Sequence, residues 1–160
     1  MPAFHHDDIV RVIPPFHRDV MLDLILAWAE VDVALKLLLS KVLNVGMSDG
    51  ADLIGRMPAS AVLAQIRKAA AANSASLEVL KLIRGHRRQY DKHAKPRNLI
   101  AHSKCVGYWI VDPNYLVFTS FEKTAEGELA VDRTPLEEMR RSHRWALAMT
   151  AMAMRIVDLN

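Results

Sequence analysis

Apolar residues recur every three or four positions along most of the chain, a pattern that predicts amphipathic helices. The first helix is expected over residues 17–44, with Gly46 as its C-terminal cap, and a second over residues 59–72. A third should begin near Ala75, and its apolar stripe gives way to charged positions on one face, namely Arg84, Arg87, Arg88, Asp91 and Lys95. Pro96 should kink or restart this helix, which would place Arg97 in a first helical turn.

The periodicity changes after His102. Two segments rich in β-branched and aromatic residues, 105–111 and 115–121, flank an Asp-Pro-Asn turn and predict a β-hairpin, and a third short strand is expected at 128–132. Thr134, Pro135, Leu136 and Glu137 form a capping-box sequence that should open a final helix to about Leu159. The predicted fold is mainly α: four to five helices, an irregular lead-in at residues 1–15, and a small antiparallel β insertion at about 105–133 before the last helix.

Composition supports one globular domain covering residues 1–160, because 51% of the residues are hydrophobic and 24% are charged. The single cysteine, Cys105, allows no internal disulfide, and the chain does not begin with the pattern of a secretory signal. A cytoplasmic protein is therefore expected. The longest apolar segment, residues 20–43, is interrupted by five charged residues, so no membrane-spanning helix and no membrane association are predicted.

Positive charge is concentrated in one part of the chain. Between residues 84 and 104 there are seven Lys or Arg residues and one acid, a balance of +6, whereas the whole chain carries +3. Such a run often forms nothing more than a solvated helix face. It also suits a phosphate backbone, and the candidate RNA-binding cations are Arg84, Arg87, Arg88, Lys95 and Lys104.

Residues 97–102 read Arg-Asn-Leu-Ile-Ala-His and combine a fixed cation, an amide and an imidazole. Arginine can clamp two phosphate oxygens, and histidine exchanges protons near neutral pH. Arg97 and His102 are about 140° apart around a helix axis, so both could line one groove only at its edges or together with a second chain. The spacing alone is weak evidence, since Arg88 and His93 reproduce it.

The string Arg-Asn-x-x-Ala-His, late in a helical bundle of this size, resembles the HEPN superfamily (higher eukaryotes and prokaryotes nucleotide-binding). The resemblance implies a metal-independent endoribonuclease, a toxin or defence protein, in which Arg97 and His102 are the catalytic pair and Asn98 is an accessory polar contact. It also implies a homodimer that acts on RNA through a composite site, because one imidazole cannot serve as base and acid in a single step. No cofactor is implied.

The chain departs from the family in one respect that bears on partners. The toxin subgroup whose antitoxin is a nucleotidyltransferase carries a tyrosine two residues after the histidine, where this chain has Lys104. An antitoxin protein stays a candidate partner. Because the tyrosine is missing, the resemblance does not extend to modification of this chain by a nucleotidyltransferase. Glu30 is the candidate accessory acid from an earlier helix, whereas an i,i+4 pair with Lys36 accounts for Asp32.

Two other interpretations stay open at this stage. The same residues could belong to a non-catalytic HEPN-like module that binds a nucleotide, RNA or another protein, or Arg97 and His102 could be a satisfied structural pair. A metal site is not expected, because no compact tetrahedral set emerges from the nearby His and Cys residues, which are His86, His93, His102 and Cys105.

Overall fold

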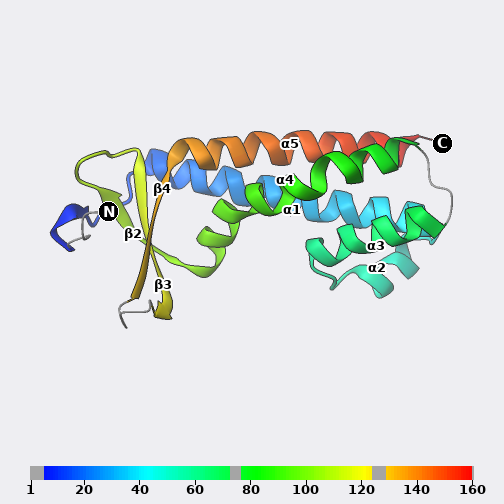
Figure 1. The fold of residues 1–160 in the computed structure, drawn as a ribbon, viewed down its shortest axis with the longest axis horizontal. Coiled ribbons are helices and arrows are strands. Elements are labelled where there is room, and N and C mark those ends of the chain that lie inside the picture. Colours follow the sequence, from blue (N-terminus) through cyan, green and yellow to red (C-terminus); the bar gives the residue numbers. More distant parts are fainter. Residues whose placement is uncertain (1–5, 73–76, 124–128, 160) are drawn as a thin grey trace. The chain divides into compact units, whose positions relative to one another are not determined.

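The computed structural model describes residues 6–72, 77–123 and 129–159, and the side chains of all of these except residues 6, 86–88, 121–123 and 129. It is mainly helical with a small antiparallel sheet, as predicted (Figure 1). The chain divides into two compact units, which we call the sheet unit (Met1–Leu26 and His93–Arg144) and the helical unit (Ala27–Lys92 and Trp145–Asn160). The helices α1 (Pro15–Leu43), α4 (Leu77–His102) and α5 (Leu136–Asp158) contribute residues to both.

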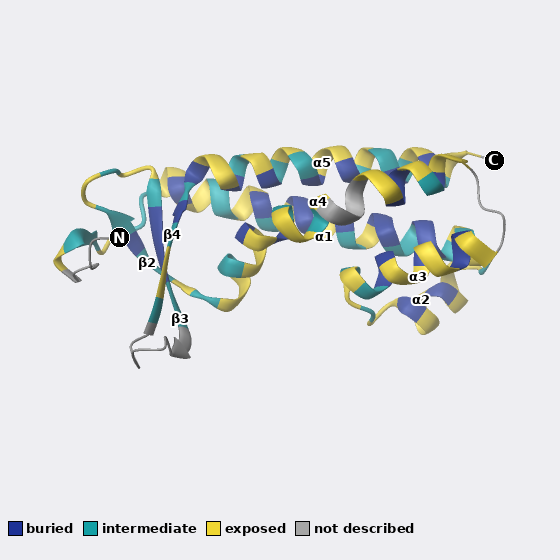
Figure 2. Ribbon diagram, viewed as in Figure 1, coloured by how far each residue is buried: buried dark blue, intermediate teal, exposed yellow. Residues whose placement is uncertain are grey.

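The helical unit is completed by α2 (Met47–Ile54) and α3 (Ala59–Ala72). Buried and exposed positions alternate along these helices with helical period (Figure 2), and the core collects leucines, isoleucines and valines of α1, α3 and α4. Trp28 is buried, with its ring stacked on Trp145 at 5.4 Å and in edge contact with Tyr90 at 5.3 Å. The predicted helices over 17–44 and 59–72 are confirmed to within two residues at each end.

The end of α1 differs from the prediction. Asn44 has a φ of 54° and takes the left-handed position that ends the helix, while Gly46 is the N-cap of α2. Asparagine tolerates this conformation because its short polar side chain reduces the usual steric penalty. Helix α2 itself was not predicted, and Gly50 within it lies so close to Ser40 that a Cβ would come within 2.5 Å of Oγ.

The sheet unit contains β1 (Ile9–Val10), β2 (Lys104–Trp109), β3 (Tyr115–Lys123) and β4 (Leu129–Pro135), in the order β1-β2-β3-β4 with all neighbours antiparallel. The predicted three strands before the last helix are confirmed, although residue 128 lies outside the described residues. The prediction of an irregular lead-in over residues 1–15 is wrong for residues 6–10, because a 3-10 turn at His6–Asp8 leads into β1. Residues 11–14 have no regular secondary structure, and residues 1–5 lie outside the described residues. A two-residue strand is too short to show a periodic pattern.

Gly107 makes the β1–β2 junction possible. Its φ of 144° is rarely adopted by residues with side chains, and a Cβ there would lie 2.0 Å from the carbonyl oxygen of Val10. The same residue belongs to a bulge, since the pairing of β2 with β3 shifts by one between Cys105 and Gly107.

One face of the sheet packs against helix residues of its own unit. His17 of α1 is buried, lies parallel to the ring of Tyr108 at 6.0 Å, and donates a hydrogen bond of 2.7 Å from Nε2 to the carbonyl of Pro113. Leu116 and Phe118 of β3 are fully buried on this side. We call it the inner face.

The last helix begins slightly later than predicted. Thr134 and Pro135 are the final residues of β4, and α5 starts at Leu136, whose amide donates to the carbonyl of Asn114. Within the described residues, none of the helices is both long enough and apolar enough to cross a membrane.

Candidate functional site

The candidate residues Arg97, Asn98 and His102 lie at the C-terminal end of α4, in the sheet unit. The expectation that Pro96 restarts the helix is wrong, because α4 continues through it to His102 and Pro96 is buried there. A proline removes one backbone hydrogen bond, and tertiary packing can outweigh that loss. The amides of a helix start are consequently not present beside Arg97, so side chains have to supply the positive charge for an anion.

The side chains of these three residues are exposed and oriented toward a common face. Arg97 donates from Nη1 to Oδ1 of Asn98 at 2.9 Å, and Asn98 precedes His102 by four residues, which places both on one side of the helix. The guanidinium is therefore drawn toward the face of His102 despite the difference of about 140° between the two Cα positions. Asn98 thus holds the guanidinium on the side of the helix that also carries His102.

Neither side chain serves the packing of the fold. Arg97 and His102 are both exposed, and within the described part of the chain no hydrogen bond or ion pair joins His102 to another side chain. The interpretation of a satisfied structural pair therefore does not hold. These groups are free to meet a ligand or a second copy of the chain.

Two of the predicted cations lie in the same unit as this pair. Lys95 precedes Asn98 by three residues and His102 by seven, so it extends their face along α4, and Lys104 begins β2 directly after the helix. Both are exposed. Arg84 is exposed in the helical unit, and the side chains of Arg87 and Arg88 lie outside the described residues.

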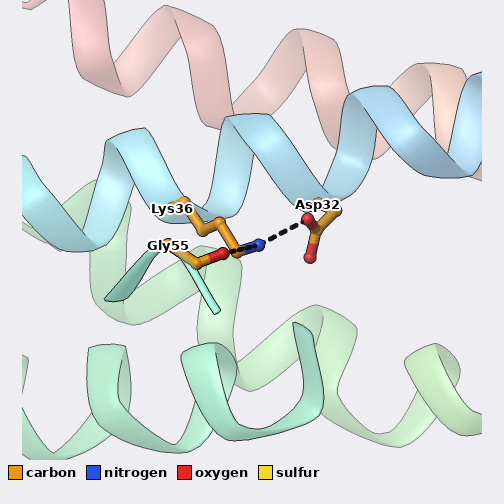
Figure 3. Close-up of polar contacts among 3 residues, drawn as sticks. All are labelled: Asp32, Lys36 and Gly55. Atoms are coloured by element: carbon orange, nitrogen blue, oxygen red, sulfur yellow. Dashed lines mark hydrogen bonds and ion pairs between the residues drawn. The ribbon is translucent and has the colours of Figure 1, made fainter. Parts of the chain in front are cut away.

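Glu30 is exposed on the part of α1 that belongs to the helical unit, and its role as an accessory acid stays a prediction. The neighbouring Asp32 has the structural role expected from its spacing. Lys36 donates to Asp32 at 2.7 Å and to the carbonyl of Gly55 at 2.9 Å, and thereby fastens α1 to the end of α2 (Figure 3).

Cys105 follows the candidate site in the sequence, and its surroundings do not favour the reactive thiolate form. Cys105 is half-buried with its Sγ 3.8 Å from the carbonyl of Gly107, and burial raises the pKa of the thiol. Among the residues that the structure describes, no three His, Cys, Asp or Glu side chains lie close enough to hold a metal ion.

Sequence reasoning missed a second set of groups, which lie half-buried on the sheet that Lys104 joins through β2. Trp109 and Tyr115 are in edge contact at 5.9 Å, and the guanidinium of Arg133 lies 4.8 Å above the ring of Trp109. Aromatic residues on either side of the predicted hairpin turn were the available signal. The bulge in β2, which no sequence pattern revealed, places Lys104 on the same face as these groups.

Comparisons of this chain with protein-family models, with curated proteins and with solved structures find no match. The function of this chain is therefore inferred from its residues and their geometry.

Proposed function

We propose that the chain is a metal-independent endoribonuclease of the HEPN type, and that two copies of it form the active site around Arg97, Asn98 and His102. The observation that carries the proposal is the exposed Arg97–Asn98 hydrogen bond on the helix end that presents His102. An arginine, an amide and an imidazole that the fold does not use for packing are suited to a phosphodiester.

The reaction that fits these groups is cleavage of RNA by its own 2′-hydroxyl. A base removes the 2′-proton as this oxygen attacks the adjacent phosphorus, and an acid protonates the 5′-oxygen as its bond to phosphorus breaks. The products are a 2′,3′-cyclic phosphate and a free 5′-hydroxyl, so atoms and charge balance without a metal or a redox partner. Arg97 stabilises the charge that develops on the phosphorus oxygens.

The need for base and acid in one step accounts for the second copy. A single His102 can be neutral or protonated at a given moment, but not both. A twofold axis would bring two His102 side chains to one phosphodiester, one as base and the other as acid, each with its own Arg97 and Asn98. Lys95 and Lys104 would hold the flanking phosphates on each side.

The direct test is cleavage of mixed RNA in EDTA by the purified protein. We expect His102→Ala to lower the rate by about 10²- to 10⁴-fold and Arg97→Ala by about 10²- to 10³-fold. Arg97→Lys keeps the charge but loses the planar fork, so it should fall between wild type and Arg97→Ala.

Arg141 and His143 provide matched controls, because they are the same residue types in the same unit but lie on α5. Alanine at these positions should leave the rate unchanged. Cleavage that survives both Arg97→Ala and His102→Ala would refute the assigned site. Binding of RNA that weakens with salt, without cleavage by the wild type, would instead identify the non-catalytic binding module.

A further inference from the structure

The face of the sheet opposite the inner face carries side chains that suit unstacked bases. On β3, Tyr115, Val117 and Thr119 alternate with the buried Leu116 and Phe118, so they point to this opposite side. The register places Lys104 opposite Thr119 and Arg133 opposite Val117, and Trp109 follows Tyr108, which is opposite Leu116. We call the set Lys104, Trp109, Tyr115 and Arg133 the stacking face.

The bulge in β2 is what brings Lys104 to this side. Between Cys105 and Gly107 the pairing shifts by one residue, which reverses the alternation along the strand. An unbulged strand would place Lys104 and Trp109 on opposite faces. The positive φ of Gly107 thus helps to place an aromatic ring and an ammonium group on one surface.

The stacking face is accessible as well as aromatic. Trp109 and Tyr115 are half-buried, Lys104 is exposed, and Val131 of β4 at the same side is 41% exposed. The side chain of Arg133 must cross β3 to reach the ring of Trp109, and Val117, which lies opposite Arg133, is fully buried. The guanidinium of Arg133 thus lies over the ring of Trp109, and the rings of Trp109 and Tyr115 stand nearly perpendicular to each other, at 83°.

The charge of the stacking face favours binding of a polyanion. Lys104 supplies an exposed positive charge, the guanidinium of Arg133 lies over the ring of Trp109, and Asp132, which pairs with Phe118, points to the inner face. No carboxylate occupies the described register positions of the stacking face on β2, β3 or β4. Indole and phenol rings stack with nucleobases of any sequence, and arginine adds a cation–π contribution.

We propose that the stacking face binds single-stranded RNA, with bases on Trp109 and Tyr115 and phosphates on Lys104. Lys104 is two residues from His102, so the strand would continue from the cleavage site onto the sheet. The identity of the polymer as RNA rests on the proposed function. Single strands are selected over duplexes because duplex bases are already stacked and present no free face.

The test measures binding separately from cleavage, in a His102→Ala background that leaves RNA intact. The probe is a short fluorescein-labelled oligoadenosine at fixed salt, followed by fluorescence anisotropy. Trp109→Leu should weaken binding by about tenfold, whereas Trp109→Phe should keep most of the affinity. The same oligonucleotide with abasic sites should bind Trp109→Leu and its parent equally, because it keeps the phosphates and lacks the bases.

Phe16→Leu is the matched control. Phe16 is an exposed ring of the same unit with the guanidinium of Arg140 5.2 Å above it, but it lies on α1 and not on the sheet. Its replacement should not change affinity.

Three results would overturn the stacking face: equal affinity of Trp109→Leu and its parent for the intact oligonucleotide, equal loss with intact and abasic strands, or a change in the oligomeric state of the protein on Trp109→Leu. The last would identify the face as a contact between copies. A different outcome would separate the two proposals. If Trp109→Leu weakens binding of the intact strand only, and cleavage persists in both Arg97→Ala and His102→Ala, the stacking face is supported and only the proposed nuclease site is refuted.

Discussion

Gly107→Ala is the substitution whose cost can be worked most directly from the structure. A side chain at φ 144° is strained by about 1–3 kcal/mol. The added Cβ would also lie 2.0 Å from the carbonyl oxygen of Val10, a backbone atom that cannot rotate away. Either β1 separates from β2 or the bulge rearranges, so we expect a total loss of about 2–4 kcal/mol in the free energy of unfolding.

Gly85→Ala makes the same chemical change where nothing opposes it. Gly85 lies within α4, and a Cβ there meets no atom within 4 Å. Alanine should stabilise by about 0.5–1 kcal/mol, because it has the higher helix propensity.

Urea denaturation followed by circular dichroism measures both variants against the wild type. The midpoint should fall for Gly107→Ala and rise for Gly85→Ala, with similar slopes. A Gly107→Ala protein as stable as the wild type would refute the geometry of the β1–β2 junction, and with it the shared face of Lys104 and Trp109.

Other contacts give further predictions. Ser142→Ala should lose about 1–3 kcal/mol of unfolding free energy, measured by denaturation, because the buried hydroxyl donates to the carbonyl of His93 at 2.5 Å. Lys36→Met should loosen the end of α2, where Gly55 would lose its bond, and faster amide exchange in α2 than in α3 would show it. The raised pKa of Cys105 lowers the thiolate fraction in the folded state, so iodoacetamide should modify it more slowly in native than in urea-unfolded protein at pH 8; equal rates would contradict its burial. Because the thiol ionises more readily in the unfolded chain, its contribution to stability should decline as pH rises above the ordinary value of 9.0, and Cys105→Ser should remove that decline.

The long elements could be predicted from the sequence because their apolar stripes repeat over several turns. Helix α2 could not, since its eight residues contain Gly50 and begin with a polar turn. Strand β1 has two residues and exists because Gly107 admits its backbone. At Pro96 the local sequence disfavours a helix. The ring is nevertheless buried within a continuous α4, and this tertiary packing outweighs the local preference.

The chemical groups of the candidate site could be predicted from the sequence, but the arrangement of their side chains could not. The sequence string at residues 97–102 gave Arg97, Asn98 and His102 as candidates, whereas the side-chain bond that links Arg97 to Asn98 required coordinates. The stacking face was beyond the sequence, because a bulge reverses which residues of β2 share a side. Glu30 belongs to the other compact unit, and its place beside Arg97 and His102 stays a prediction.

The measurement that tests the central claim most directly is the rate of RNA cleavage in EDTA by mixtures of wild type and His102→Ala, refolded together at constant total concentration. If one site needs His102 from both copies, the rate follows the square of the wild-type fraction, and an equal mixture retains about one quarter of the activity. A site complete within each chain would give a linear dependence and about one half. The quadratic curve is the predicted result, and a linear curve, or no cleavage by the wild type, would contradict the composite nuclease site.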